Sequence, residues 1–99
     1  MYMKLIQEDI SNIIDIPDIY KTYDLCMEAL KLDVMSLAYI PTKYITRELC
    51  LELVKRNGAV LEFIPEEYKT YEICWEAVHE YPEAIRSVPD KYKNIGGNI

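Results

Sequence analysis

The sequence predicts an all-α protein, a short α-solenoid-like stack of three two-helix repeats with a half-repeat at each end. A block of 24 residues recurs without a gap at 17–40, 41–64 and 65–88, with Pro, Tyr, Thr, an acidic residue, an aliphatic residue and Cys in register. Within each block the apolar residues follow a helical period. A unit this small cannot bury its own apolar face, so neighbouring units must stack.

Residues 1–16 predict an N-terminal half-repeat. They align with the last sixteen positions of a block, which places Leu5 and Ile6 on Leu53 and Val54. The apolar positions are kept while the middle of the segment turns polar. That pattern is typical of a terminal repeat with one face in solvent, so we expect an N-terminal cap.

A first helix is predicted to begin after the threonine of each block. Thr22, Thr46 and Thr70 are each followed two residues later by an acidic residue, Asp24, Glu48 or Glu72. A hydroxyl at the N-cap and an acid in the first turn both satisfy the free N–H end of a helix. The predicted inward positions are Leu25, Cys26, Ala29 and Leu30, then Leu49, Cys50, Leu53 and Val54, then Ile73, Cys74, Ala77 and Val78.

This helix of about ten residues should end near Asp33, at Asn57-Gly58 and at Tyr81-Pro82. We expect Asn57-Gly58 to supply a left-handed cap. A second, shorter helix follows, with apolar residues three apart, and the prolines Pro41, Pro65 and Pro89 end it. The apolar pairs are Leu37 and Ile40, Leu61 and Ile64, and Ile85 and Val88.

The connector between blocks carries a tyrosine in each copy: Tyr20, Tyr44, Tyr68 and Tyr92. We expect this column to pack between the repeats, with each hydroxyl bonded to a backbone carbonyl. Residues 89–99 should form a partial repeat followed by a frayed tail. A leucine-rich repeat is the rival architecture, since 24 residues lie within its range. Its repeating leucine framework is absent, which favours helices.

Length and charge restrict the function. The 99 residues should form a single repeat domain, 1–99. The net charge of −6 repels phosphate backbones and anionic lipids alike, so neither direct nucleic-acid binding nor membrane binding is expected. The first residues reach acidic side chains too early for a signal peptide, and the cysteine count is odd, so we expect a cytoplasmic protein.

No pattern predicts catalysis, a cofactor, a metal site or a small-molecule substrate. The three cysteines share one repeat position on the inward face, where stacked helices lie too far apart for a disulfide. We expect them buried and free. His79 takes the position of Lys31 and Lys55 at a helix C-terminus, and no second histidine is present to form a metal pair.

The candidate partner-binding residues form a ridge beside the core stripe of the first helices. Its members are Tyr23 and Met27, then Arg47 and Leu51, then Tyr71 and Trp75, with an acidic rim that includes Asp24, Glu48, Glu72 and Glu76. Large side chains at the edge of a small core are commonly covered by the second helices. If they are exposed, aromatic and arginine residues with an acidic rim are typical of protein–protein interfaces.

The block resembles a family of short tandem α-helical repeats that is described as a domain of unknown function and occurs in bacterial and large-DNA-virus proteins. Residues 17–88 carry the resemblance, as in Pro65-x-x-Tyr68-x-Thr70-x-Glu72-Ile73-Cys74-x-x-Ala77-Val78. The second block departs from it with Leu53 where the others have Ala29 and Ala77. The resemblance implies a helical repeat fold and brings no active-site residues.

Two functions are therefore expected. The first is a non-enzymatic interaction module whose partner is another protein. The alternative is a small acidic inhibitor, phage- or virus-like, that blocks a nucleic-acid-binding enzyme by charge mimicry, because the acidic excess is concentrated in residues 65–88.

Overall fold

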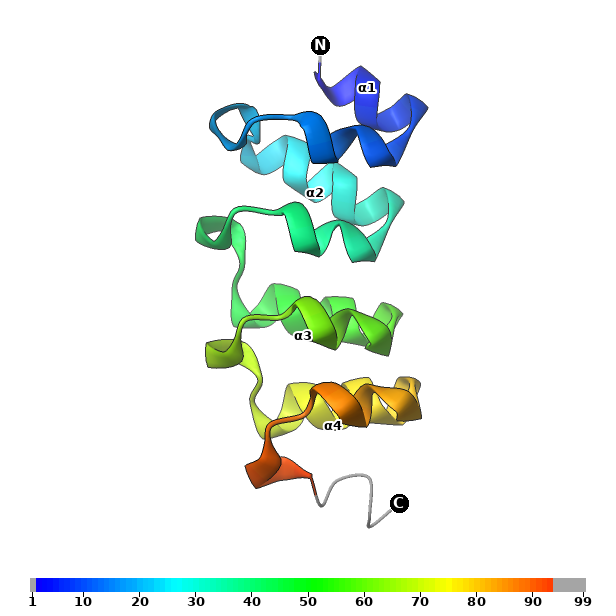
Figure 1. The fold of residues 1–99 in the computed structure, drawn as a ribbon, viewed down its shortest axis with the longest axis vertical. Coiled ribbons are helices and arrows are strands. Elements are labelled where there is room, and N and C mark those ends of the chain that lie inside the picture. Colours follow the sequence, from blue (N-terminus) through cyan, green and yellow to red (C-terminus); the bar gives the residue numbers. More distant parts are fainter. Residues whose placement is uncertain (1, 94–99) are drawn as a thin grey trace. The chain divides into compact units, whose positions relative to one another are not determined.

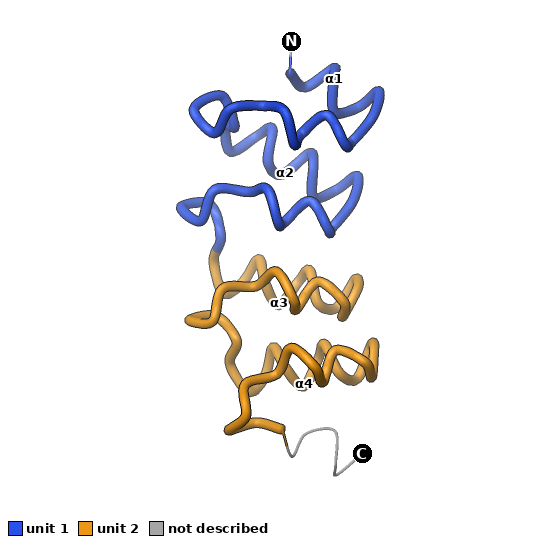
Figure 2. Tube along the Cα trace, viewed as in Figure 1, with its two compact units in different colours: residues 1–45 blue, residues 46–99 orange. Residues whose placement is uncertain are grey.

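The computed structural model describes residues 2–93, of which 79% lie in helices. Residues 2–93 contain no strand, which confirms the all-α prediction and removes the leucine-rich alternative for this part of the chain. The predicted frayed tail, from Asn94 onward, lies outside the described residues. The chain divides into two compact units, residues 1–45 and 46–99 (Figure 2). Each unit is described by itself.

The three long helices begin where the threonines predict. They are α2 (Tyr23–Leu32), α3 (Arg47–Arg56) and α4 (Tyr71–Glu80). In each helix the threonine Oγ1 accepts a hydrogen bond from the backbone N–H three residues later, at 3.2 Å for Thr22, 3.1 Å for Thr46 and 3.3 Å for Thr70. The predicted N-caps are therefore confirmed.

The helices end at the predicted residues but by a different mechanism. Asp33, Asn57 and Tyr81 all have extended backbone, with φ of −158°, −158° and −143°. No described residue has a positive φ, Gly58 included, so the expected left-handed cap is wrong. Asp33 and Asn57 instead start the next helix, because their side chains accept a 3.0 Å hydrogen bond from the N–H two residues on.

The predicted second helix is a 3₁₀ helix of six residues. The four copies are η1 (Ile10–Asp15), η3 (Val34–Tyr39), η5 (Gly58–Phe63) and η7 (Pro82–Ser87). Apolar residues three apart share one face of such a helix, which has three residues per turn. After each proline the connector forms one further 3₁₀ turn: η2 (Asp18–Tyr20), η4 (Thr42–Tyr44), η6 (Glu66–Tyr68) and η8 (Asp90–Tyr92).

In unit 1, α1 (Tyr2–Glu8) packs on η1 and α2, and η1 also packs on η3 (Figure 1). Ile6, Ile13 and Ile16 are each at most 4% exposed, and they are the residues that segment 1–16 contributes to the core. Leu5 is 38% exposed, so the expectation that it packs inward like Leu53 is wrong. The segment 1–16 therefore covers part of α2 with its isoleucines.

In unit 2, α3 and α4 lie side by side, and η5 and η7 form a second layer against them (Figure 1). The closest approach is at Gly58, which faces the last turn of α4. A Cβ atom at Gly58 would overlap the carbonyl oxygen of Ala77. The Gly58 N–H donates a 2.6 Å hydrogen bond to Glu80 Oε1, which joins η5 to α4.

A buried lysine in unit 1 has no counterpart in the sequence predictions. Lys21 is only 6% exposed, and its Nζ lies 3.0 Å from Asp18 Oδ1 and donates to the Tyr39 carbonyl oxygen at 2.8 Å. Lys69 and Glu66 repeat the ion pair at 2.9 Å in unit 2. A lysine three residues after an acidic residue, at Asp18 and Lys21, Glu66 and Lys69, and Asp90 and Lys93, was the available sequence signal.

Candidate interaction surface

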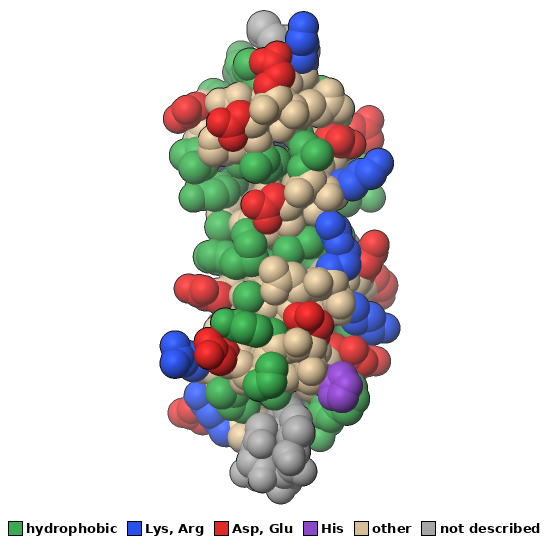
Figure 3. Space-filling model, turned by 90° about the vertical axis from the view of Figure 1, so that its right-hand side faces the viewer, with side chains coloured by type: hydrophobic (Ala, Val, Ile, Leu, Met, Phe, Trp, Pro, Cys, Tyr) green, Lys and Arg blue, Asp and Glu red, His purple; other side chains and the backbone are tan. Residues whose placement is uncertain are grey.

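The aromatic members of the predicted ridge are exposed. Tyr23, Tyr71 and Trp75 are 58%, 56% and 38% exposed, so the second helices do not cover them. Arg47 is also exposed, whereas Met27 and Leu51 are half-buried. On the face drawn in Figure 3, hydrophobic side chains lie exposed between acidic ones.

In unit 1, Tyr23 is held by the connector that follows its helix. Its ring meets the edge of Tyr44, with centroids 5.9 Å apart and planes at 70°. The ammonium of Lys43 lies 5.1 Å from the Tyr44 ring centroid. A tyrosine pair with its own cation therefore forms at this end of α2.

Unit 2 repeats this arrangement and adds a second ring pair. Tyr71 meets Tyr92 edge-on at 5.7 Å and 82°, and Lys91 lies 5.1 Å from the Tyr92 centroid. Trp75 stacks on His79 at 4.8 Å with planes only 7° apart. We name these four residues, Tyr71, Trp75, His79 and Tyr92, the aromatic edge of unit 2.

The contacts of α4 show on which side the aromatic edge lies. Glu80 bonds to Gly58 in η5, which precedes α4, whereas Tyr71 touches Tyr92 in η8, which follows it. Because residues are spaced by about 100° around a helix, Tyr71 and Trp75 share the side opposite Glu80. The aromatic edge therefore faces away from α3.

The same geometry separates the two ridge pairs of unit 2. Arg47 and Leu51 occupy the equivalent side of α3, which faces α4 and leaves Leu51 half-buried. The outer face of α4, with Glu72 and Glu76, lies between them and the aromatic edge. The structure does not join Arg47 and Leu51 to Tyr71 and Trp75 in one patch.

The carboxylates of the predicted rim border the aromatic edge. Glu72 is exposed and Glu76 is half-buried on the outer face of α4. Within residues 2–93, neither side chain forms a hydrogen bond or an ion pair. The sequence of α4 contains three glutamates and no lysine or arginine, unlike α2 and α3. This surface is locally acidic.

The predicted tyrosine column is wrong at its first member, and within residues 2–93 none of the connector tyrosines bonds its hydroxyl to a backbone carbonyl as expected. Tyr20 is 54% exposed and lies against Tyr2, with ring centroids 5.4 Å apart. Tyr44, Tyr68 and Tyr92 are half-buried, and the ring contacts of Tyr44 and Tyr92 are with a tyrosine and a lysine at the surface. The connector tyrosines therefore contribute to the surface as well as to the packing.

The three cysteines are free and fully buried, as predicted. Burial raises the pKa of Cys50 to about 11. Burial also raises the pKa of Cys26 and Cys74, although the nearby Lys21 and Lys69 partly oppose the effect. These thiols remain protonated at neutral pH, which suits packing rather than nucleophilic chemistry.

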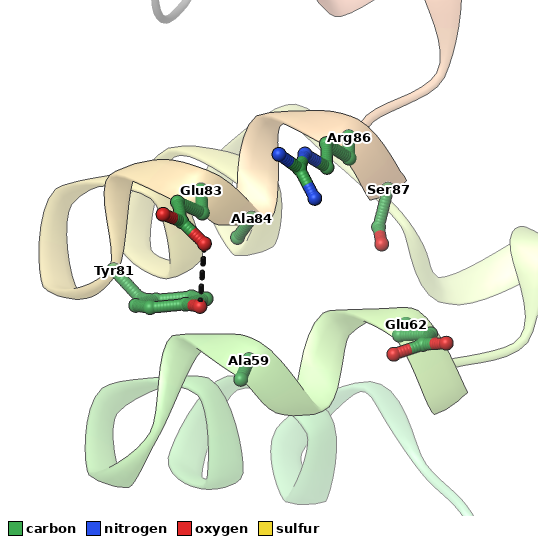
Figure 4. A pocket seen from close by; sticks show the side chains of 7 residues that line it. All are labelled: Ala59, Glu62, Tyr81, Glu83, Ala84, Arg86 and Ser87. Carbon is green, nitrogen blue, oxygen red and sulfur yellow. Dashed lines mark hydrogen bonds between the residues drawn. The ribbon is translucent and has the colours of Figure 1, made fainter.

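A shallow pocket of about 400 Å³ lies between η5 and η7, where the sequence analysis placed no site. Ala59 and Glu62 lie on one side of it, and Tyr81, Glu83, Ala84, Arg86 and Ser87 on the other (Figure 4). The Tyr81 hydroxyl donates to Glu83 Oε2 at 2.9 Å, and this bond and the Glu83 charge raise the pKa of Tyr81. Glu62 and Arg86 occupy the same repeat position in successive blocks. This pair of opposite charges was the sequence signal for polar side chains on the two sides of the pocket.

No helix in residues 2–93 combines the length and apolar character that a membrane crossing needs. In the same range, no three His, Cys, Asp or Glu side chains are grouped to hold a metal ion.

One segment of the chain matches a known protein family. Neither the curated proteins nor the solved structures gave a match. Residues 46–93 match the family model described as "Domain of unknown function (DUF4116)", and this segment coincides with the described part of unit 2. The resemblance to a family of unknown function is therefore confirmed for residues 46–93.

Proposed function

We propose that this protein is a non-enzymatic protein–protein interaction module of the cytoplasm, and that the aromatic edge of unit 2 is its binding surface. The observation that carries the proposal is the exposure of Tyr71 and Trp75, at 56% and 38%, on one side of α4. Large aromatic side chains that lie exposed beside one another are costly to leave in water, and such residues are enriched at the centres of protein–protein interfaces.

The rings of the aromatic edge are held in place before any partner arrives. Trp75 is stacked on His79, and Tyr71 rests on Tyr92. Side chains that are already ordered lose less conformational entropy on binding, so more of their contact energy remains as affinity. This arrangement supports a binding role over a purely structural one.

We further propose that the whole chain is a solenoid-like stack of three 24-residue repeats. The support is that helix bounds recur at this interval: α2, α3 and α4 begin at Tyr23, Arg47 and Tyr71. Repeats of this kind present matching residues on successive helices, which is how they build extended binding surfaces.

The test is affinity capture with matched variants. The variant Tyr71→Arg/Trp75→Leu places on α4 the residues that α3 carries at the same positions, Arg47 and Leu51, so the helix should still form. A host protein captured by the wild type should lose about 2–4 kcal/mol of affinity for this variant. The control is Ile19→Ala, at a residue that is 84% exposed in unit 1. Equal affinity of the wild type and the aromatic variant would contradict the proposed surface.

A second candidate function is charge mimicry by an acidic inhibitor. The observation that favours it is the group of glutamates in and near α4, of which Glu67 and Glu72 are exposed, Glu76 is half-buried, and all three have no partner within residues 2–93. Changing these three to lysine should then abolish binding, and association should slow steeply with salt. Binding that is insensitive to salt and survives the charge reversal would eliminate this candidate.

A further inference from the structure

We infer that the partner of the aromatic edge presents an arginine beside an apolar residue, and that the arginine lies over Trp75 or Tyr71 with its guanidinium directed at Glu72 and Glu76. This inference rests on the proposed function, because it names the chemistry of the partner that the surface would take. It depends on three observations on α4.

The first observation is that the carboxylates next to the exposed rings have no cation. Glu72 and Glu76 have no hydrogen-bond or ion-pair partner among residues 2–93. The nearby acid Glu66 is already paired with Lys69, and Glu80 is bonded to Gly58. Two unpaired negative charges at the border of an apolar surface favour a partner with positive charge.

The second observation is that lysine ammonium groups already lie beside two of the connector tyrosine rings. Lys91 lies 5.1 Å from the centroid of Tyr92, and Lys43 lies at the same distance from Tyr44 in unit 1. Tyr71 and Trp75 have no such lysine among the described residues, although indole binds cations best of the side-chain rings. His79 stacks on one face of the indole, so a cation from a partner would lie over the other face.

The third observation is the contrast between neighbouring helices with the same scaffold. At the positions of Tyr71, Trp75 and His79, α3 carries Arg47, Leu51 and Lys55. The helix α3 therefore carries charges of both signs, whereas α4 has three glutamates and no lysine or arginine. The acidic aromatic character belongs to α4 and is not a requirement of the fold.

Arginine fits this surface better than lysine does. Its planar guanidinium stacks on an aromatic ring and can still donate to a carboxylate at its edge. The aliphatic part of the arginine and the adjacent apolar residue would cover the remaining exposed surface of Trp75 and Tyr71. A lysine provides the charge but lacks the flat face.

The probe is a blocked hexapeptide, ALRLRA, compared with three peptides in which both arginines are replaced by lysine, citrulline or glutamate. Trp75 is the sole tryptophan of the chain, so its fluorescence reports binding at this site directly. We expect a saturable change in Trp75 emission with the arginine peptide. Binding should weaken about threefold with lysine and about tenfold with uncharged citrulline, and it should be absent with glutamate.

Two variants that each remove two negative charges locate the site. Glu72→Gln/Glu76→Gln should weaken the arginine peptide about tenfold while keeping the Trp75 reporter. Glu48→Gln/Glu52→Gln makes the same charge change at the equivalent positions of α3 and should leave the affinity within about twofold. Circular dichroism checks that each variant folds, and sedimentation checks that no second copy of the chain competes for the surface.

The inference fails if citrulline or glutamate peptides bind as well as the arginine peptide, or if the arginine peptide gives no saturable response below about 10 mM. It also fails if both glutamine variants behave alike. A captured host protein that depends on Tyr71 and Trp75 but is indifferent to Glu72→Gln/Glu76→Gln would uphold the interaction module and overturn the arginine partner. Indifference to the aromatic residues would instead overturn the proposed binding surface.

Discussion

At the scale of single residues, Gly58 is a position in unit 2 where a side chain has no room. An alanine Cβ would overlap the Ala77 carbonyl oxygen and would stand 2.9 Å from the Cβ of Tyr81. Gly58→Ala should therefore destabilise the protein by about 1–3 kcal/mol through overpacking. Chemical denaturation measures the loss, with Glu62→Ala on the same 3₁₀ helix as the control. Equal stability of the two variants would mean that η5 can move away from α4 at little cost.

The sequence points to Gly58 for the wrong reason. Asn57-Gly58 is a typical left-handed helix cap, yet both residues have negative φ, and the glycine is needed for close packing. The repeat position of Gly58 does not always need a glycine, because Ile10 occupies the same position in unit 1. Periodicity locates the contact between η5 and α4, but the distance between two backbones depends on tertiary packing that no local pattern encodes.

The buried thiol of Cys50 gives a prediction about pH. Its pKa is raised from the ordinary value of 9.0 to about 11 by burial. A raised pKa in the folded state contributes stability that is complete below the unfolded value and is lost as the pH rises through the folded value. The advantage of the wild type over Cys50→Ala should therefore be largest near neutral pH and shrink by about 1–2 kcal/mol near pH 10.5.

Parallel denaturant titrations of the wild type and Cys50→Ala at several pH values measure this difference. At neutral pH the alanine variant should be less stable by about 1–2 kcal/mol, because packed volume is lost. A difference that stays constant from pH 7 to about pH 10.5 would show that the Cys50 thiol has its ordinary pKa in the folded protein.

At the scale of elements, the threonine caps should account for a measurable share of stability. Each threonine satisfies one free N–H of a ten-residue helix. Thr22→Ala, Thr46→Ala and Thr70→Ala should each cost about 1 kcal/mol in the free energy of unfolding. Thr42 lies exposed in η4 and caps no α-helix, so Thr42→Ala should change stability by less than about 0.5 kcal/mol. Similar losses at all four sites would argue against capping as the cause.

The long helices were predictable in start, length and, apart from the half-buried Leu49, in buried face, because a hydroxyl cap and the spacing of apolar residues act within a single turn. The second helices were predictable in place but not in type. Leu37 and Ile40, or Leu61 and Ile64, are three apart, and this spacing fits an α-helix and a 3₁₀ helix about equally well. The type appears in the hydrogen bonds that follow the extended residues Asp33 and Asn57, whose carbonyl oxygens accept from the N–H groups of Ser36 and Val60, three residues on, at 3.0 and 3.1 Å.

The sequence was enough to choose the candidate surface residues, but it did not show which of them would be exposed. Helical spacing places Tyr71 and Trp75 beside the core stripe, but the same spacing places Leu51 there, and Leu51 is half-buried. The difference arises because α4 covers that side of α3, while on the corresponding side of α4 the short turn η8 touches Tyr71 through Tyr92 and leaves Tyr71 and Trp75 exposed. Ring pairs such as Trp75 with His79 follow from positions four apart, whereas the contact of Tyr71 with Tyr92 requires the folded connector.

At the scale of the whole molecule, the first sixteen residues should matter for stability. Ile6, Ile13 and Ile16 are at most 4% exposed, and they belong to a segment that packs on α2. Deletion of residues 1–16 removes these contacts and uncovers part of the buried face of α2, which includes Leu25 and Leu30. Loss of an end segment is costly in repeat proteins, because each unit is stabilised mainly by its neighbours.

The three cysteines make this loss measurable along the chain, because each long helix carries one fully buried thiol. After deletion of residues 1–16, Cys26 in α2 should react with a thiol reagent much faster than in the intact protein. Cys74 in α4 should change far less if the damage decays from unit to unit, and the emission of Trp75 should keep its native position. Equal acceleration at Cys26 and Cys74 would instead mean that the whole chain unfolds as one cooperative body. Unchanged labelling at Cys26 would show that the first sixteen residues contribute nothing to the stability of α2.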